Sequence, residues 1–330
     1  MRGVNIEKYR FDFDLTFGVL ALNPDGTVYH RYGGRDSRSP GHWTTPASFE
    51  QMLSASLERH QEYTAAPSPP ELQPRLQPEQ IPAFAKRDKG ECIHCHNVHE
   101  GLQQEAKDQK TWSFADIWVH PAPERLGLDL DRDDQRLVIQ VQPESAADKA
   151  GLKVGDRLIR VGTTTIASAS DVMHASDSFP AAGGKLPVAF LRNGEAQTVK
   201  LSLPPDWKRS APASFAWRAI KWTLDPVPGF GGPAIDATQR AALKIPEGEF
   251  AFRIQYFVTW GPRAAYGKRA GEAGLRADDI VLAVAGKRDF ESVDHFHAWW
   301  RLTRQAGEVV PIHVLRNGEP MVFQLEVPRS

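Results

Sequence analysis

Two cysteines and the histidine that follows them form the most specific chemical pattern in this chain. Residues 92–96 read Cys-Ile-His-Cys-His, a complete C-x-x-C-H string of the kind to which c-type haem is covalently attached. Thiols at this spacing can meet the two vinyl groups of a haem, and the adjacent imidazole can reach its iron from one face. The pattern therefore predicts heme c held by Cys92, Cys95 and His96, with His96 as an axial ligand of the haem iron.

Two other uses of the same side chains remain open. Zinc takes four nitrogen or sulfur ligands, and Cys92, Cys95, His96 and His99 could supply them. A dithiol or disulfide would use the cysteines alone, but a thioredoxin-type pair should follow a strand and open a helix, and this pair follows a proline-rich stretch. If haem is bound, the second axial ligand has three candidates: His94, His99 and His120.

The residues on either side of the C-x-x-C-H string have contrasting compositions. Residues 65–90 contain six prolines among Gln and Glu, which predicts an extended linker or a segment lying along a surface. Residues 98–110 are polar and cannot enclose a haem by themselves. We therefore treat residues 91–118 as a separate C-x-x-C-H segment, in which we expect three aromatic side chains to help cover a haem: Trp112, Phe114 and Trp118.

A hairpin and a helix are expected before the linker. Residues 15–22 and 27–32 read as two strands, and Asn23-Pro24-Asp25-Gly26 between them has the composition of a type I turn. Thr45-Pro46 is a typical start of a helix. The expected buried stripe of that helix has five members: Phe49, Met52, Leu53, Ser56 and Leu57.

This order of elements resembles the second half of a thioredoxin-like fold. The first half, with its redox helix, is not seen before it. The resemblance implies that residues 1–64 are a truncated thioredoxin-like segment. We expect the missing strands, and any redox site on them, to lie upstream of Met1.

The rest of the chain contains an internal repeat. Residues 150–159, AGLKVGDRLI, recur as residues 273–282, AGLRADDIVL, and the string LRNGE at 191–195 recurs at 315–319. The two copies lie about one domain length apart along the chain, so the repeating unit is a domain and not a solenoid repeat. Each copy reads as strand, small-residue helix, strand, helix and a hairpin through Asn-Gly.

The AGL-x-x-GD string followed by an Arg-Asn-Gly hairpin resembles the PDZ domain of HtrA-type proteases. We assign residues 119–205 to PDZ domain 1, the first copy, and residues 206–330 to a PDZ-like domain 2, the second copy. The resemblance implies two capped β-barrels in an α+β multidomain chain. PDZ domains bind an extended peptide as an added strand, and the backbone of a glycine-containing loop holds its terminal carboxylate.

The same resemblance implies which residues contact the peptide. In the first copy, Leu126-Gly127-Leu128 fits the loop, because glycine lets the backbone approach a carboxylate closely. Val172 and Ala175 are expected to line the helix side of the groove. In the second copy the expected loop is Gly229-Phe230-Gly231-Gly232, with Phe230, Gly231 and Gly232 expected to contact the peptide. Three bulky side chains of the second helix are expected to pack in a core or an interface: Phe296, Trp299 and Trp300.

Composition and missing motifs narrow the function. A net charge of −1 gives no argument for binding to nucleic acid or to an anionic membrane. No apolar run approaches the roughly 18 residues of a membrane span. The Gly-x-Ser-Gly nucleophile of HtrA-type proteases does not occur in the sequence, so we do not expect this chain to be a protease.

The order of a thioredoxin-like segment, C-x-x-C-H and PDZ resembles a family of bacterial thioredoxin-like/PDZ proteins, some of them selenoproteins. Haem is attached outside the cytoplasm, which implies a periplasmic or otherwise exported full-length protein. We therefore expect PDZ-mediated binding of extended polypeptide or a protein C-terminus by an exported, redox-associated protein that carries heme c. The alternatives are a thiol or selenol oxidoreductase whose active site lies upstream of Met1, and a zinc-stabilised scaffold.

Overall fold

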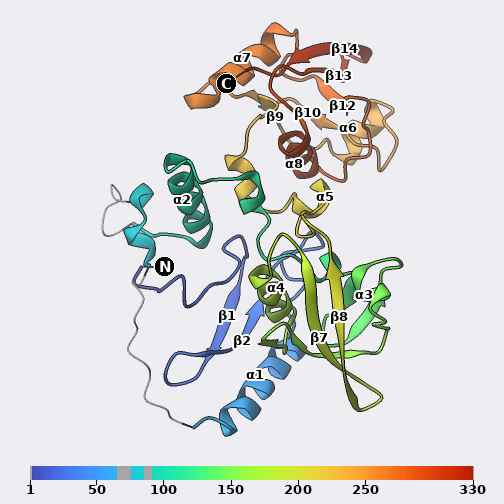
Figure 1. Ribbon diagram of the computed structural model, residues 1–330. Helices are drawn as coiled ribbons and strands as arrows, with labels where there is room; N and C mark the ends of the chain where they lie inside the picture. Colours follow the sequence, from blue (N-terminus) through green and yellow to red (C-terminus); the bar gives the residue numbers. More distant parts are fainter. Residues whose placement is uncertain (1, 65–75, 85–90, 330) are drawn as a thin grey trace. The chain divides into compact units, whose positions relative to one another are not determined.

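The computed structural model describes residues 2–64, 76–84 and 91–329, and the chain forms two compact units (Figure 1). The first unit is Met1–Ser210 and the second is Ala211–Ser330. The boundary lies close to the predicted start of the second copy. Among the described residues, no helix is both long enough and apolar enough to span a bilayer.

In the first unit, strands and helices alternate along the chain. Its strands are β1 (Gly18–Leu22), β2 (Val28–Gly33), β3 (Leu128–Leu130), β4 (Val138–Val141), β5 (Arg157–Val161), β6 (Thr164–Thr165), β7 (Gly184–Arg192) and β8 (Glu195–Leu203). Its α-helices are α1 (Pro46–Gln61), α2 (Cys95–Asp108), α3 (Ala146–Lys149) and α4 (Ala169–Ser178). Short 3₁₀ helices occur at Pro78–Gln80, Pro82–Phe84, Phe114–Ile117 and Pro123–Arg125.

The first copy is built on an antiparallel sheet of order β6-β5-β7-β8 and a separate ribbon of β3 and β4. The apolar faces of both, with α3 and α4, form one core that includes Leu158, Val188 and Phe190. An isolated antiparallel bridge between Leu137 and Arg157 joins the ribbon to the sheet. The expected closed barrel is therefore wrong, because one bridge does not complete the ring of hydrogen-bonded strands.

The expected hairpin is present as β1 and β2. The side chain of Asn23 fixes its turn by accepting hydrogen bonds from the backbone N–H groups of Asp25 (3.1 Å) and Thr27 (2.8 Å). Strand β2 lies beside α4 of the first copy and beside α1. The hairpin and α1 thus pack within the first unit, and no further strand of a thioredoxin-like fold is paired with β1 or β2 among the described residues.

The buried face of α1 differs from the expected stripe. Leu53 and Leu57 are exposed, whereas Met52 and two serines, Ser48 and Ser56, are buried. Small serine side chains allow the helix to approach β2 closely. The hydroxyl of Tyr32 on β2 lies 2.9 Å from Ser48 Oγ, so α1 and β2 are joined by a polar contact as well as by apolar packing.

The second unit repeats this plan. Its strands are β9 (Phe230–Gly231), β10 (Phe252–Arg253), β11 (Tyr256–Phe257), β12 (Ile280–Val284), β13 (Val309–Arg316) and β14 (Glu319–Glu326). Its helices are α5 (Pro212–Phe215), α6 (Ala237–Ala242), α7 (Ala264–Glu272) and α8 (Val293–Thr303), with 3₁₀ helices at Ala219–Thr223 and Gly261–Arg263. The sheet order is β10-β12-β13-β14, and β9 pairs with β11.

The repeated sequence strings meet as an arginine–aspartate clamp in both copies. Arg192 donates to both carboxylate oxygens of Asp156 at 2.7 Å and to the Gly151 carbonyl at 2.8 Å. Arg316 makes the same two-pronged contact with Asp279, at 2.7 and 2.8 Å. Both aspartates are almost completely buried. The clamp fastens the hairpin arginine to the turn before the next strand, which explains why the two strings recur together.

Loss of the clamp is expected to destabilise its own copy. The change Arg192→Met leaves the buried Asp156 carboxylate without its main partner, which should lower the urea concentration at which the first unit unfolds. Urea unfolding followed by circular dichroism measures this effect. The control is Arg160→Met on the same sheet, where the arginine is exposed. Equal midpoints for the two variants would show that the clamp adds no stability.

Candidate functional site

The loop of the first copy has the local geometry expected of a glycine-containing carboxylate loop. Gly127 has φ +90°, a conformation that favours glycine. A Cβ at this position would lie 2.1 Å from Ser145 Oγ, so the glycine is also required by close packing. The loop leads directly into β3, whose Leu128 pairs with Val141 of β4. Apart from β4, no strand among the described residues pairs with β3.

The predicted peptide-contacting side chains lie together but are not accessible. Leu126, Leu128 and Val172 are 0% exposed and Ala175 is 5% exposed. All four belong to one apolar cluster, and Trp43, also 0% exposed, belongs to the same cluster. The residues that should bind a partner are therefore covered by the chain itself.

The cover is residues 34–43, which we call the covering segment. It begins beside α4, where a side chain at Gly34 would contact the Met173 sulfur at 3.7 Å. Arg38 is its charged anchor: the guanidinium bonds Asp129 of β3 at 2.9 Å, and it pairs with Glu124 before the loop at 3.1 Å. The segment therefore contacts both the helix and the strand that should bound the groove.

Trp43 is the apolar anchor of the covering segment. Its carbonyl accepts a hydrogen bond from Gln135 Nε2 at 3.0 Å, and Gln135 Oε1 in turn accepts from the backbone N–H of Ala169 at 3.0 Å. The Arg38 guanidinium lies 4.8 Å from the centre of the indole ring. One glutamine thus ties the indole-bearing residue to the first turn of α4.

A buried polar contact holds β2 against the same helix. His30 Nδ1 lies 2.9 Å from Asp171 Oδ2, and the backbone N–H of Arg31 donates to Asp171 Oδ1 at 2.8 Å. Ser168, the residue that caps α4, donates its hydroxyl to the Arg31 carbonyl. These contacts position the strand from which the covering segment continues.

Burial and charge act in opposite directions on the ionisable groups at the covering segment. Glu124 is largely buried, and burial raises the pKa of its carboxyl group. The Arg38 guanidinium acts in the opposite direction on that pKa because it stabilises the carboxylate. The Arg38 pKa is raised by Asp36 and Asp129 against the opposing effect of burial. Removing the covering segment would therefore deprive Glu124 and Asp129 of the Arg38 charge that stabilises their carboxylates.

In the second copy, the equivalent of the first loop is centred on Gly229, the first residue of the expected stretch. The Gly229 carbonyl accepts from Val258 N, as the Gly127 carbonyl accepts from Gln142 N, both at 2.8 Å. Gly229 has φ +82°. Pro228-Gly229-Phe230 is therefore the equivalent of the first loop, whereas Gly231 and Gly232 of the expected stretch lie beyond it.

Gly231 and Gly232 have a different structural role. A Cβ on Gly231 would lie 2.5 Å from the Tyr256 hydroxyl, and one on Gly232 would lie 1.9 Å from the Arg253 carbonyl. Both glycines are thus required where β9 packs against residues 253–256. Neither belongs to the loop that would hold a carboxylate.

Helix α8 of the second copy is also covered, in this case by residues 212–223 at the start of the second unit. Phe296 and Trp300 of α8 fill the core as expected, and Trp299 packs against that core. Arg301 is buried, its guanidinium lies 4.8 Å from the Trp222 ring centre, and burial lowers its pKa to about 10. The pKa of His297 is lowered mainly by burial and, to a smaller extent, by the charge of Arg301. In this unit, α5 packs against α8.

The C-x-x-C-H string lies at the start of α2. Cys92 is exposed and Cys95 is half-buried at the first position of the helix, where burial raises the pKa of its thiol. His96 points to Glu100, with 3.3 Å between Nδ1 and Oε1, and His99 points to Asp14, with 3.5 Å between Nδ1 and Oδ2.

In the described part of the chain, no three His, Cys, Asp or Glu side chains are grouped as a metal site. His120, the third candidate axial ligand, lies 3.6 Å from Asp177 of α4. The haem and zinc assignments stay predictions from the motif. A pyridine haemochrome spectrum of protein made with haem-maturation machinery tests the first of them.

Comparison with known proteins identifies the first copy. A PDZ domain family model matches residues 124–203. A probable periplasmic serine endoprotease DegP-like protein of Marinomonas sp. is 26% identical over 236 residues, which cover 70% of this chain and 45% of the relative. The magnetosome formation protease MamE of Magnetospirillum gryphiswaldense is 26% identical, covering 60% of this chain and 28% of the relative.

The structural likenesses are partial. The HtrA-type protease AlgW with decapeptide is 17% identical, covers 59% of this chain and 55% of its own, and has a TM-score of 0.28. The serine endoprotease from Yersinia pestis is 21% identical, covers 31% and 35%, and has a TM-score of 0.25. The chain spans less than half the length of the first curated relatives that it matches. The chain is thus similar to a PDZ domain over residues 124–203 and, at 26% identity, to a protein named as a DegP-like periplasmic serine endoprotease.

Proposed function

We propose that this chain binds extended polypeptide through the PDZ domain of the first copy, and that the covering segment must leave the groove before a peptide can enter. Two observations together carry the proposal. A PDZ family model matches residues 124–203, and within them Gly127, in the left-handed conformation, leads into β3, one edge of which pairs with no other strand among the described residues. PDZ domains bind by strand addition at such an edge.

The apolar floor of the groove supports this function. Leu128, Val172 and Ala175 offer the surface that would receive an apolar peptide side chain, and Trp43 occupies that surface in the covered state. The peptide and the indole therefore compete for one place. The apparent affinity of the chain for peptide is then its intrinsic affinity multiplied by the fraction of molecules that are open.

The location of the chain and the role of its second copy are also proposals. Its relatives bear the names of periplasmic proteases, and its own sequence contains no Gly-x-Ser-Gly string. We propose that the chain acts outside the cytoplasm as a binding protein, with the second copy as a further PDZ-like module whose helix is covered by residues 212–223. Thiol or haem chemistry at Cys92 and Cys95 is not needed for this function.

The test is peptide binding by fluorescence anisotropy with the full chain. The probe is a labelled decapeptide that ends in an apolar residue with a free carboxylate, and the matched probe has the same sequence with an amidated C-terminus. We expect the free carboxylate to bind roughly tenfold more tightly, because charge-assisted hydrogen bonds to the loop are lost on amidation. Equal affinity for the two probes would contradict carboxylate recognition.

Arg38→Ala tests the competition with the covering segment. This change removes the contacts of the segment with Asp129 and Glu124, so the free-carboxylate peptide should bind more tightly to the variant than to the parent chain. Arg263→Ala is the control, because that arginine is similarly exposed and paired with Asp225 in the second unit. If neither chain binds the probe, the groove is not a peptide site.

A further inference from the structure

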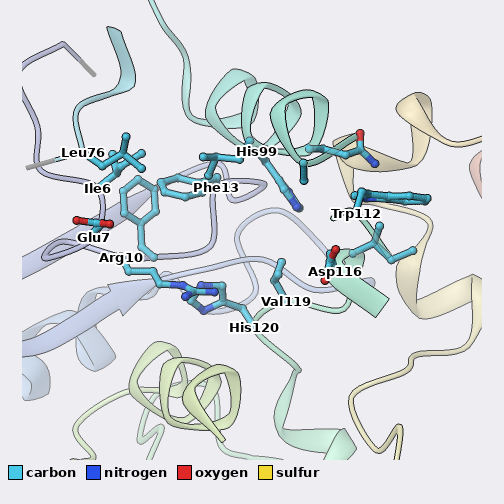
Figure 2. A pocket seen from close by; sticks show the side chains of 15 residues that line it. Ile6, Glu7, Arg10, Phe13, Leu76, His99, Trp112, Asp116, Val119 and His120 are labelled. Atoms are coloured by element: carbon cyan, nitrogen blue, oxygen red, sulfur yellow. The ribbon is translucent and has the colours of Figure 1, made fainter. Parts of the chain in front are cut away.

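A cavity of about 380 Å³ lies in the first unit (Figure 2), and no residue of the Gly127 loop or of α4 is among those that line it. It is bounded by residues 6–13 and Leu76 and, further along the chain, by helix α2 and the residues 112–120 that follow it. Its volume falls in the range of small-molecule sites in proteins.

The walls of the cavity are mainly apolar. Phe11 and Phe13 come from the N-terminal segment, Leu102 from α2, and Ile117 and Val119 from the stretch after α2. Such walls accommodate an acyl chain or a ring, because they offer dispersion contacts and few groups that must stay hydrated.

Two N–H donors inside the cavity have no hydrogen-bond partner. Gln103 is 7% exposed, and its Nε2 is buried without a partner. Trp112 Nε1 is likewise buried without a partner, and an indole nitrogen can only donate. Buried donors in folded proteins are almost always satisfied, so two such groups lining one cavity indicate that an acceptor belongs between them.

The charges around the cavity are consistent with an acidic ligand. Figure 2 shows His99 directed into the space from α2, with Arg10 and His120 on the opposite wall. The two acidic residues that line it, Glu7 and Asp116, are both exposed. The buried polar groups are thus donors or imidazoles, and the carboxylates lie where water can solvate them.

We propose that this cavity binds an apolar carboxylic acid, with the acyl or aryl part against the Phe13 wall and the carboxylate accepting hydrogen bonds from Gln103 and Trp112. A carboxylate has two oxygens and can satisfy both donors at once. This site does not use the loop or the groove of the PDZ domain, so it is independent of the proposed peptide binding.

Isothermal titration of the full chain with octanoate tests the proposal, with octan-1-ol as the matched uncharged probe. We expect one saturable octanoate site per chain and weaker binding of the alcohol, which cannot accept two charge-assisted hydrogen bonds. Gln103→Leu should weaken octanoate binding by at least about tenfold, since it removes a buried donor to a charged group.

Gln104→Leu is the matched control, because Gln104 is the next residue of α2, is exposed and bonds Asp108 instead. Ala106→Leu narrows the cavity without touching either donor and should also weaken binding, which provides a second variant if Gln103→Leu does not fold. Equal octanoate affinities for Gln103→Leu and Gln104→Leu, equal binding of octan-1-ol and octanoate, or no saturable octanoate binding would each overturn the proposal.

Discussion

Replacing Trp43 with alanine is expected to tighten peptide binding by at least about tenfold and to lower the thermal stability of the first unit. Trp43 is fully buried and packs in the same apolar cluster as Leu128 and Val172. A buried Trp→Ala change typically costs about 3–5 kcal/mol. Most of that loss falls on the covered state, because the indole leaves the groove when the covering segment opens.

The size of the gain follows from the competition between peptide and indole. Each 1.4 kcal/mol by which the covered state is weakened relative to the open state raises the open fraction, and so the apparent affinity, about tenfold while the open state is rare. Even a fraction of the full packing energy is therefore enough for the expected change. The same substitution leaves the loop at Gly127 and the strand edge of β3 in place.

Anisotropy titration with the free-carboxylate decapeptide measures the affinity, and differential scanning calorimetry measures the stability. Trp260→Ala is the control, since Trp260 is 61% exposed in the second unit. Peptide should raise the melting temperature of Trp43→Ala more than that of the parent chain. Unchanged affinity together with a lowered melting temperature would show that the covering segment is a permanent part of the fold.

Replacing Asp171 with alanine should lower the free energy of unfolding of the first unit by about 3–5 kcal/mol, which is typical of removing a buried carboxylate and leaving its hydrogen-bond partners unpaired. Asp171 is 0% exposed. Its carboxylate accepts from His30 Nδ1, from the backbone N–H of Arg31 and from the backbone N–H of Ala167 at 3.0 Å. All three partners would remain buried without an acceptor, and β2 would lose its attachment to α4.

Urea unfolding of the full chain, followed by tryptophan fluorescence, checks this expectation. Asp133→Ala is the control, because Asp133 is exposed in the same unit. Asp171→Asn should lower the free energy of unfolding less than Asp171→Ala does, since an amide oxygen can still accept one of the backbone hydrogen bonds. A midpoint for Asp171→Ala close to that of Asp133→Ala would contradict a structural role for the pair.

The sequence by itself determined the repeat and the features that are local to it. The strings around Gly151 and Asn193 predict a helix end, a turn and a hairpin from neighbouring residues alone, and the structure contains all three. The first loop, at Gly127, was expected from the PDZ resemblance, and Gly127 has the left-handed backbone conformation that such a loop requires. In the expected second loop, Gly229, Gly231 and Gly232 all fit the pattern, and only the bond from Val258 selects Gly229 as the equivalent of Gly127.

Tertiary structure alone decided whether the groove is open. A tryptophan in a polar Gly- and Pro-containing stretch indicates that the stretch is buried somewhere, but the partner of Trp43 lies more than 80 residues away and no local pattern connects the two. The cavity beside α2 is likewise formed by residues from distant parts of the chain, such as Phe13 and Trp112. Contacts of this kind depend on how whole elements pack, because the packing energy of a side chain is determined by its neighbours in space and not by those in the chain.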